Sequence, residues 1–383
     1  SPVAFCPRRD YDEKHGHSYR QGRTAMRPPR MIWEFGTAYD MLVSLIILHD
    51  PARFGVRGMW ASGMRSRLPA SSRAFMEEIQ GALVRTVPLG WVHSLPDPRD
   101  GATLLWALEQ VPPAARIAAM TVFDRTPADL LAILNDAAAH GAWDKRDEDA
   151  LFAAFSAERS APPPARRDMA TILKWWANAE EFGVRYLQAL RAYYESFFAE
   201  EESRIRPVLQ QALAEAQLMA ARLPLPRLLE NLSQGVRFAR LPEADEYVFA
   251  PSFWGFPLLF HHQIAPGRWM FLFGARPPDA SLVPGEAVPD ALVMVLKALG
   301  DPTRLRILRY LSGQTLTPTM LAGRLRLRTP TVIYHLNTLR MAGLVAIELG
   351  ADGERGYTAR PQQVGAAFEA LSGFLGTAEP DVD

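Results

Sequence analysis

The sequence predicts a mainly α-helical protein with small β elements, in which a large helical domain with a β-hairpin region precedes a smaller C-terminal domain. Three observations support this fold class. The chain has 383 residues, which is room for two or three domains of roughly 100 to 200 residues each. Apolar residues recur at three- and four-residue steps through much of residues 33–223, the period of an amphipathic helix. Aromatic and β-branched residues then dominate between Gly235 and Ala275, which is typical of short strands.

Composition limits the functions open to this chain. Forty-two Lys and Arg balance 42 Asp and Glu, so any charge-driven function must be local. The one cysteine, Cys6, excludes an intrachain disulfide and a zinc site with two thiolates, and it favours a reducing, cytoplasmic setting. No apolar stretch approaches the roughly 18 residues that a membrane span needs. The sequence has no P-loop, dinucleotide fingerprint or nucleophile motif, so we predict no enzyme activity, cofactor or metal.

The N-terminal domain is predicted to follow a disordered arm. Residues 1–30 are basic and poor in large apolar side chains, and the alternative is an extension upstream of the true start. The domain itself is predicted over residues 31–275, with an early helix at Gly36–Leu48. Its longest helices are expected in residues 166–223, with a kink or break near a proline, and its strands in residues 235–275.

A proline-rich linker at residues 276–289 precedes the C-terminal domain, which is predicted over residues 290–376 with a short tail at 377–383. Glycines at 313 and 343 are placed to end two of its helices in the left-handed conformation. Three helix starts are indicated by an Asp or Thr N-cap followed by proline at the first helical position: Asp301-Pro302, Thr317-Pro318 and Thr329-Pro330.

The spacing of these elements predicts a winged helix-turn-helix. Only Arg326–Arg328 separates the second helix from the third, which is the short turn of a helix-turn-helix. Residues 344–349 and 355–359 then have the composition of two strands, joined by a turn that contains Asp352-Gly353. A helix-turn-helix followed by such a hairpin is a winged helix.

The third helix of this domain is predicted to bind DNA. Residues 291–375 carry ten Lys and Arg against five Asp and Glu, so this part has a net charge of +5 and the remainder −5. Because Val332, Leu336 and Leu339 form the core-facing stripe, the opposite side chains are expected to face the major groove. The predicted DNA-binding residues are Arg326, Arg328, Thr329, Thr331, Tyr334, His335, Asn337, Thr338, Arg340 and Arg355.

The runs Leu296–Leu308 and Thr331–Val345 resemble ArsR-type winged-helix repressors, a resemblance that covers about 85 of the 383 residues. It implies a homodimer that binds an inverted-repeat operator in double-stranded DNA and releases it when an effector binds. Metal-sensing members carry cysteines in the helix that matches Pro318–Leu325, and this segment has none. Ile333 stands where many members carry a small polar residue, so no operator preference is carried over.

The large domain resembles, more faintly, a helical domain of uncharacterised function that precedes ArsR-type modules in other bacterial regulators. His49-Asp50-Pro51, Trp60 and Tyr247–Ser252 carry that resemblance, which implies an architecture but no ligand. Aromatic side chains can line a closed apolar cavity, so we predict that this domain senses a small apolar ligand. Packing in the core or in a dimer is the alternative for the predicted pocket residues Trp175, Trp176, Tyr194, Phe198, Trp254 and Phe256.

Three further groups have structural interpretations. His261 and His262 are adjacent in a strand and are expected to face opposite sides, so they do not chelate together. Glu200–Glu202 is predicted to be a solvated helix face. Arg304 and Arg306 are equally open to contact with phosphate and to a capping or pairing role.

Together these features predict a DNA-binding transcriptional regulator, a repressor that acts as a homodimer and senses a small apolar ligand. Dimerisation is expected through the apolar faces of Val288–Leu299 and Gln362–Leu375, with further area from the aromatic residues between Trp175 and Phe198. Two alternatives remain open. The large domain only dimerises or recruits a protein partner, or, least favoured, it is an enzyme tethered to DNA.

Overall fold

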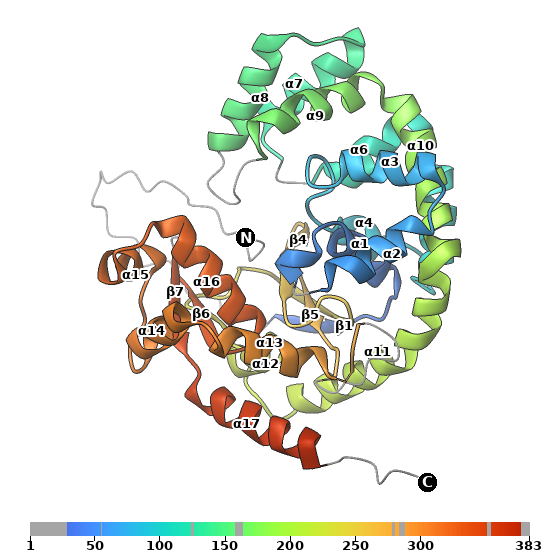
Figure 1. Cartoon of the computed structure of the whole chain (residues 1–383). Coiled ribbons are helices and arrows are strands. Elements are labelled where there is room, and N and C mark those ends of the chain that lie inside the picture. The colour runs from blue at the N-terminus through green and yellow to red at the C-terminus, as the bar shows by residue number, and fades with distance from the viewer. Residues whose placement is uncertain are drawn as a thin grey trace, which may run out of the picture.

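The computed structural model shows helices wrapped around a small central sheet, with the C-terminal domain on the other side of that sheet (Figure 1). This arrangement confirms the predicted mainly α class with small β elements. The predicted arm, except its last two residues, and the tail at 377–383 lie outside the described part of the chain. The structure describes residues 29–54, 56–123, 126–157, 164–277, 280–282, 288–350 and 354–376.

The N-terminal helices are short until the chain reaches the long pair α10 and α11, which form an arc along one side of the molecule (Figure 1). The predicted break near Pro207 is absent, because α11 runs through this proline; the irregular turn lies instead between α10 and α11, where Tyr194–Phe198 forms a π-helical segment. The helices are α1 (Ala38–His49), α2 (Gly58–Ser66), α3 (Ala70–Ile79), α4 (Leu89–His93), α5 (Gly101–Gln110), α6 (Pro113–Thr121), α7 (Ala128–His140), α8 (Lys145–Ala157), α9 (Met169–Ala177), α10 (Ala179–Tyr193), α11 (Ala199–Ala220) and α12 (Leu225–Leu232), with 3-10 turns at Pro51–Phe54 and Arg166–Asp168.

A four-stranded mixed sheet occupies the centre, in the order β1-β3-β5-β4. Its strands are β1 (Arg30–Trp33), β3 (Glu246–Ser252), β4 (Leu259–Ala265) and β5 (Arg268–Gly274). The predicted hairpin is present as the antiparallel pair β4 and β5, whereas β3 runs parallel to both β1 and β5. From the sequence, Arg30 was placed in the predicted arm and residues 31–33 in the mainly helical domain. This was wrong, because these four residues form a strand that pairs with β3.

Both faces of this sheet are buried. Val248 and Met270 belong to the core formed with the N-terminal helices, whereas Phe249 and Phe271 belong to a second core on the opposite face. Neighbouring residues of a strand point to opposite faces, so the unbroken apolar run of β3 is the pattern of a strand covered on two sides. His261 is buried in the second core, where burial lowers the pKa of its imidazole to about 3.

The C-terminal domain has the predicted winged helix-turn-helix arrangement. The side chains of Asp301 and Thr317 cap two helices by accepting hydrogen bonds from the backbone amides of Arg304 and Met320, at 2.9 and 3.3 Å. Thr329 is instead the first residue of its helix and gives no side-chain cap. The elements are α13 (Asp290–Leu299), α14 (Pro302–Leu311), α15 (Pro318–Leu325), α16 (Thr329–Met341), β6 (Val345–Leu349), β7 (Arg355–Ala359) and α17 (Pro361–Gly376).

The wing carries an additional strand from the N-terminal domain. Strand β2 (Val236–Phe238) pairs in parallel with β6, which gives a second sheet in the order β2-β6-β7. The second core likewise contains residues from both sides of the predicted linker, with Leu228 and Val236 beside Ile307 and Leu336. The proline-rich segment at 276–289 therefore does not divide the hydrophobic cores.

A buried carboxylate joins the helices to the sheet. Asp40 of α1 is fully buried and accepts hydrogen bonds from the Ser252 hydroxyl at 2.7 Å and from the backbone amides of Phe253 and Trp254 at 3.1 and 2.8 Å. Burial raises the pKa of Asp40 to about 7, and these hydrogen bonds act in the opposite direction. Asp40 thus fixes the turn that follows β3.

The predicted solvated face at Glu200–Glu202 is wrong for two of its three residues. Glu201 and Glu202 are only 4% and 5% exposed, because the start of α11 packs against the sheet and against α5. Glu201 accepts a hydrogen bond of 2.8 Å from the indole of Trp254, and Glu202 accepts one of 3.1 Å from the backbone amide of Gly101. A run of charges in the sequence gave no sign of these partners, which lie far away along the chain.

The junction before β2 depends on a glycine. Gly235 has a φ of +104°, and a Cβ at this position would lie 3.3 Å from Cδ of Arg360 and 3.4 Å from Cβ of Ala346. We expect Gly235→Ala to lower the free energy of unfolding by about 1 to 3 kcal/mol, since an L-residue is strained in this conformation. Urea unfolding measures it, with Gly63→Ala as the control in an open helical position of α2. The control is expected to raise stability by about 0.5 to 1 kcal/mol; equal effects of the two variants would contradict the assignment.

The Asp40 carboxyl predicts a pH dependence of stability. Its pKa is raised from 3.8 in the unfolded chain to about 7, so between these values the folded state binds the additional proton. Stability from this group is therefore complete below about pH 4 and is lost as the pH rises through about 7. Asp40→Asn, which resembles the neutral acid, should remove this dependence. The expected result is that the unfolding free energy of wild type relative to Asp40→Asn falls between pH 5 and pH 8; a constant difference would refute it.

Candidate DNA-binding surface

Helix α16 presents one polar, solvent-exposed face. Val332, Leu336 and Leu339 are fully buried, which confirms the predicted core-facing stripe. Tyr334 lies on the other side and is 65% exposed, with Thr331 exposed one turn earlier. The Thr338 hydroxyl donates a hydrogen bond to the Tyr334 carbonyl, so its methyl group is the part left for contact with a base. These side chains share the face on which a recognition helix reads base edges.

The turn before α16 adds positive charge to this face. Arg326 ends α15 in the left-handed conformation with a φ of 57°, and Arg328 is the N-cap of α16; both residues are exposed. Thr329 follows Arg328 directly and is the first residue of α16. Positive charge attracts phosphate and the helix dipole favours an anion at this end of α16, so the two arginines are placed to suit a DNA phosphate.

Three predicted residues lie at the margin of this face. Nδ1 of His335 is buried without a partner among the described residues, and this histidine contributes to lowering the pKa of Asp301 after the larger effect of the Arg304 backbone amide. Asn337 is half-buried. Arg355 lies on the same side of β7 as the buried Tyr357, and its charge is felt by His261 of the sheet. It therefore faces the domain junction rather than the outer side of the wing.

Arg340 does not fit the role predicted for it. It is only 3% exposed and points away from Tyr334, into the junction with the N-terminal domain. Arg304, which the sequence left open between a phosphate contact and a capping role, is used for capping. Its guanidinium donates hydrogen bonds to the carbonyls of Ala298 and Lys297 at the end of α13. Arg304 thus brings positive charge from the start of α14 to the C-terminus of α13, where the helix dipole favours it.

Of the six side chains predicted to form an effector pocket, four are buried in the core formed by the N-terminal helices, and Tyr194 packs against that core. Trp175 packs edge-on against Phe75 with ring centroids 5.1 Å apart, and Trp254 stacks on Trp60 at 6.1 Å. Phe256 lies under the Arg276 guanidinium. Of the rest, Trp176 and Phe198 are buried in the same core, and the Tyr194 hydroxyl donates to Glu202. Core packing, the alternative interpretation, describes these positions.

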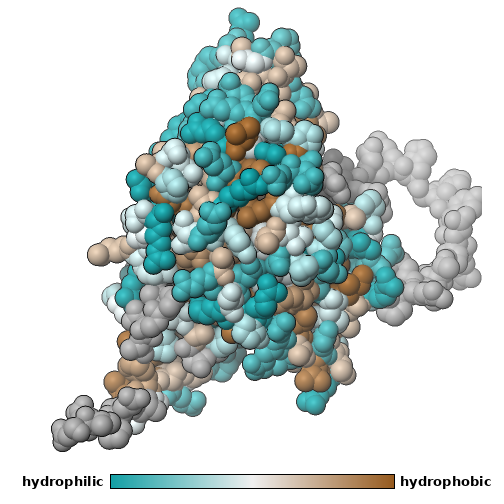
Figure 2. All heavy atoms as spheres, turned by 90° about the vertical axis from the view of Figure 1, so that its right-hand side faces the viewer, coloured by the Kyte–Doolittle hydropathy of each residue, from teal (hydrophilic) through white to brown (hydrophobic). Residues whose placement is uncertain are grey.

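The aromatic residues between Trp175 and Phe198 also leave little surface for a dimer. Trp175, Tyr193 and Phe197 are at most 9% exposed. Figure 2 shows the side of the molecule along α10 and α11, which is mostly hydrophilic with small hydrophobic patches. The expectation that this aromatic band adds area to a dimer interface is therefore not met.

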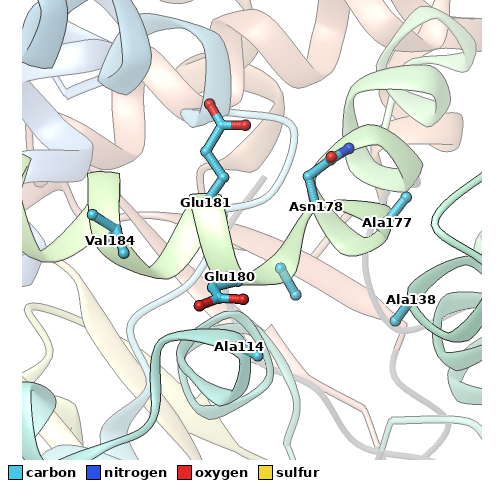
Figure 3. Close-up of a pocket in the computed structure, with 8 residues that line it drawn as sticks. Ala114, Ala138, Ala177, Asn178, Glu180, Glu181 and Val184 are labelled. Atoms are coloured by element: carbon cyan, nitrogen blue, oxygen red, sulfur yellow. The ribbon is translucent and has the colours of Figure 1, made fainter.

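An open hollow of about 680 Å³ lies where α9 meets α10 (Figure 3). Small side chains form most of its wall, and Glu180 and Ala114 approach each other across it in the view shown. Sequence reasoning did not single it out, because alanines on a helix carry no functional signal. Its lining residues are Ala114, Ala138, Ala177, Asn178, Ala179, Glu180, Glu181 and Val184.

Comparison with known proteins agrees with this geometry. A helix-turn-helix domain model matches residues 299–348. The chain contains a helix-turn-helix domain. It is also 40% identical over 52 residues to an uncharacterized HTH-type transcriptional regulator of Methanocaldococcus jannaschii, a match that covers 13% of this chain and 58% of that protein. These matches support a DNA-binding regulator and do not extend to the large N-terminal domain.

The described residues include neither a membrane-spanning helix nor a cluster of metal ligands. No helix there is both long and apolar enough to cross a membrane. Within the same residues, no group of three or more His, Cys, Asp or Glu is placed to hold a metal ion.

The exposed face of α16 predicts two kinds of DNA contact. Tyr334→Ala should lose about 1 to 3 kcal/mol of discrimination at particular base pairs, because it removes a side chain that faces the bases. Arg328→Ala should weaken binding to all sequences and reduce the slope of log K against log salt by about 1. Fluorescence anisotropy with selected and random duplexes measures both effects. Arg191→Ala on α10 is the control, since its surface pair with Glu109 lies on the opposite side of the molecule. Equal losses on both duplexes for Tyr334→Ala would show that this face does not read bases.

Proposed function

We propose that the protein is a transcriptional repressor that binds an inverted-repeat operator as a homodimer and releases it when a small apolar molecule binds the N-terminal domain. The observation that carries the DNA-binding part is the exposed face of α16, where Thr331 and Tyr334 lie close to the two exposed arginines of the preceding turn. One such helix contacts too few base pairs to select a site in a genome, so two copies acting together are needed.

The apolar surface of α17 supports a homodimer. No residue of this 16-residue helix is buried, and Phe368 and Leu375 are 56% and 67% exposed. Helix α17 contacts α13, on which Leu296 is also exposed. These are the two segments expected from the sequence to form a dimer interface. A second copy of the same surface would cover them symmetrically.

Two observations support regulation by a small molecule. The open hollow beside α10 has a volume within the usual range for ligand sites, and five of its eight lining residues are alanine or valine, which can contact an apolar group. The N-terminal domain also shares a core with the winged helix, so a change in its packing reaches α16. The second candidate is a domain that only dimerises or recruits a protein partner. Thermal-shift screening separates the two, because a ligand at 100 times its Kd stabilises the folded protein by about 2.7 kcal/mol.

The dimer predicts a mass of about twice 42.7 kDa by light scattering. Phe368→Glu places a charge on the apolar face of α17 and should give a monomer that binds operator DNA weakly but retains binding to random duplex. Ala370→Glu, on the opposite side of the same helix, is the control and should remain dimeric. A wild-type mass that stays monomeric at all concentrations, together with a footprint without two-fold symmetry, would overturn the proposal.

A further inference from the structure

The buried arginine of the recognition helix contacts two separate parts of the N-terminal domain. Nη2 of Arg340 donates hydrogen bonds to the carbonyl of Ser233 at 2.6 Å and to the carbonyl of Pro257 at 3.2 Å. Ser233 ends α12 just before β2, and Pro257 lies in the turn between β3 and β4. One guanidinium therefore joins α16 to two segments that meet the winged helix from different directions.

The contact of Arg340 with these two carbonyls adds little to the stability of the fold, because the buried charge has few partners. Nε and Nη1 of Arg340 are buried and have no hydrogen-bond partner within the described residues, and no described carboxylate forms an ion pair with it. Burial, followed by the nearby charge of Arg360, lowers the pKa of Arg340 to about 10, so it remains charged at neutral pH. Burying a charge with few partners is unfavourable, and apolar side chains of similar size would pack there more favourably. Two directed hydrogen bonds supply what an apolar contact does not, a fixed orientation.

A second arginine holds the same segment from the other side. Nη1 of Arg360 donates to the carbonyl of Gln234 at 2.7 Å and to that of Gly343 at 3.1 Å. The backbone amide of Ile347 in β6 donates to the Gly235 carbonyl at 3.0 Å. Residues 233–238 are thus bound to the end of α16 and to the wing together.

The second carbonyl that Arg340 uses leads back to the helical core. The turn before Pro257 begins at Phe253 and Trp254, whose backbone amides are held by the buried carboxylate of Asp40. Asp40 of α1 and Arg340 of α16 therefore hold backbone groups of the same turn, at Trp254 and at Pro257. Each contact is between a side chain and backbone, which leaves little freedom to slide.

We propose that Arg340 is a positioning residue that fixes the orientation of α16 relative to the N-terminal domain and does not contact DNA. This inference rests on the proposed function. In a dimer the two recognition helices must lie about 34 to 36 Å apart to enter successive major grooves. Arg340 sets that separation by attaching each helix rigidly to the domain beside it. Through the orientation of α16, Arg340 determines which spacing between half-sites the dimer prefers. It does not contribute to the attraction between the protein and DNA phosphates.

The test compares substitutions of Arg340 in the full-length protein with the matched substitution Arg328→Met on the DNA-facing turn. The probes are an inverted repeat selected from random duplexes with the wild-type protein, the same repeat with one or two base pairs inserted between its halves, and a random duplex. Affinities are measured by fluorescence anisotropy between about 50 and 200 mM salt, a range over which phosphate contacts dominate the change. Circular dichroism confirms that each variant is folded.

We expect Arg340→Met to weaken binding to the selected repeat by roughly 2- to 30-fold, the range typical of residues that couple two sites. Its affinity for random duplex and its salt slope should be unchanged, and its preference for the original spacing over the inserted ones should shrink. Arg340→Lys, which can donate to both carbonyls, should restore the spacing preference. Arg328→Met should instead lower the salt slope by about 1 and leave the spacing preference intact.

The possible results are distinguishable. A salt slope lowered by about 1 in Arg340→Met would show a phosphate contact and overturn the inference, as would an unchanged spacing preference. If Arg340→Met does not fold, Arg340→Gln takes its place, since its amide donates to one of the carbonyls and the same spacing measurement decides. If the wild-type protein binds none of the duplexes, the proposed function fails, and that result is separate from any difference between the Arg340 variants.

Discussion

The structure depends on one constraint: the central sheet is covered on both faces, so two hydrophobic cores share the same strands. Phe249 and Phe271 stack with ring centroids 5.3 Å apart on the face toward the winged helix. Their neighbours Val248 and Met270 are fully buried on the other face, among the N-terminal helices. A close-packed protein interior has low compressibility, so a displacement of one side chain is passed on to its neighbours. A shift of β3 or β5 caused on one side is therefore felt on the other.

The added strand β2 makes the same connection through the backbone. The exposed edge of a wing is a row of unpaired amides and carbonyls, and β2 covers this edge at β6. The pairing fixes the register of three residues, whereas a flexible tether of similar length would leave the winged helix free to rotate. The proline-rich segment at 276–289 links the domains along the chain, but the rigid link between them is made by residues 233–238.

Signals that act over a few residues made the C-terminal domain predictable from the sequence. The caps at Asp301 and Thr317, the three-residue turn and the apolar stripe of α16 all depend on neighbours within one or two helical turns. The exposure of Tyr334 followed from the same helical period. The errors arose where the partner is distant in sequence. Strand β1 needs a partner more than 200 residues away, and the burial of Glu202 and Arg340 depends on contacts with Gly101 and Ser233. No local pattern contains that information.

Charge placement explains why the arginine of α16 is buried whereas the two arginines of the preceding turn are exposed. Arg326 and Arg328 lie at the start of α16, where the helix N-terminus already favours an anion, so their charges add to the attraction for a phosphate. Arg340 lies at the opposite end, where the helix dipole favours a cation, and its guanidinium donates to the carbonyls of Ser233 and Pro257. Arginines near the two ends of α16 therefore have different roles. At the first end the proposed partner is a DNA phosphate; at the second the partner is the backbone of the N-terminal domain, to which the Arg340 guanidinium is hydrogen-bonded.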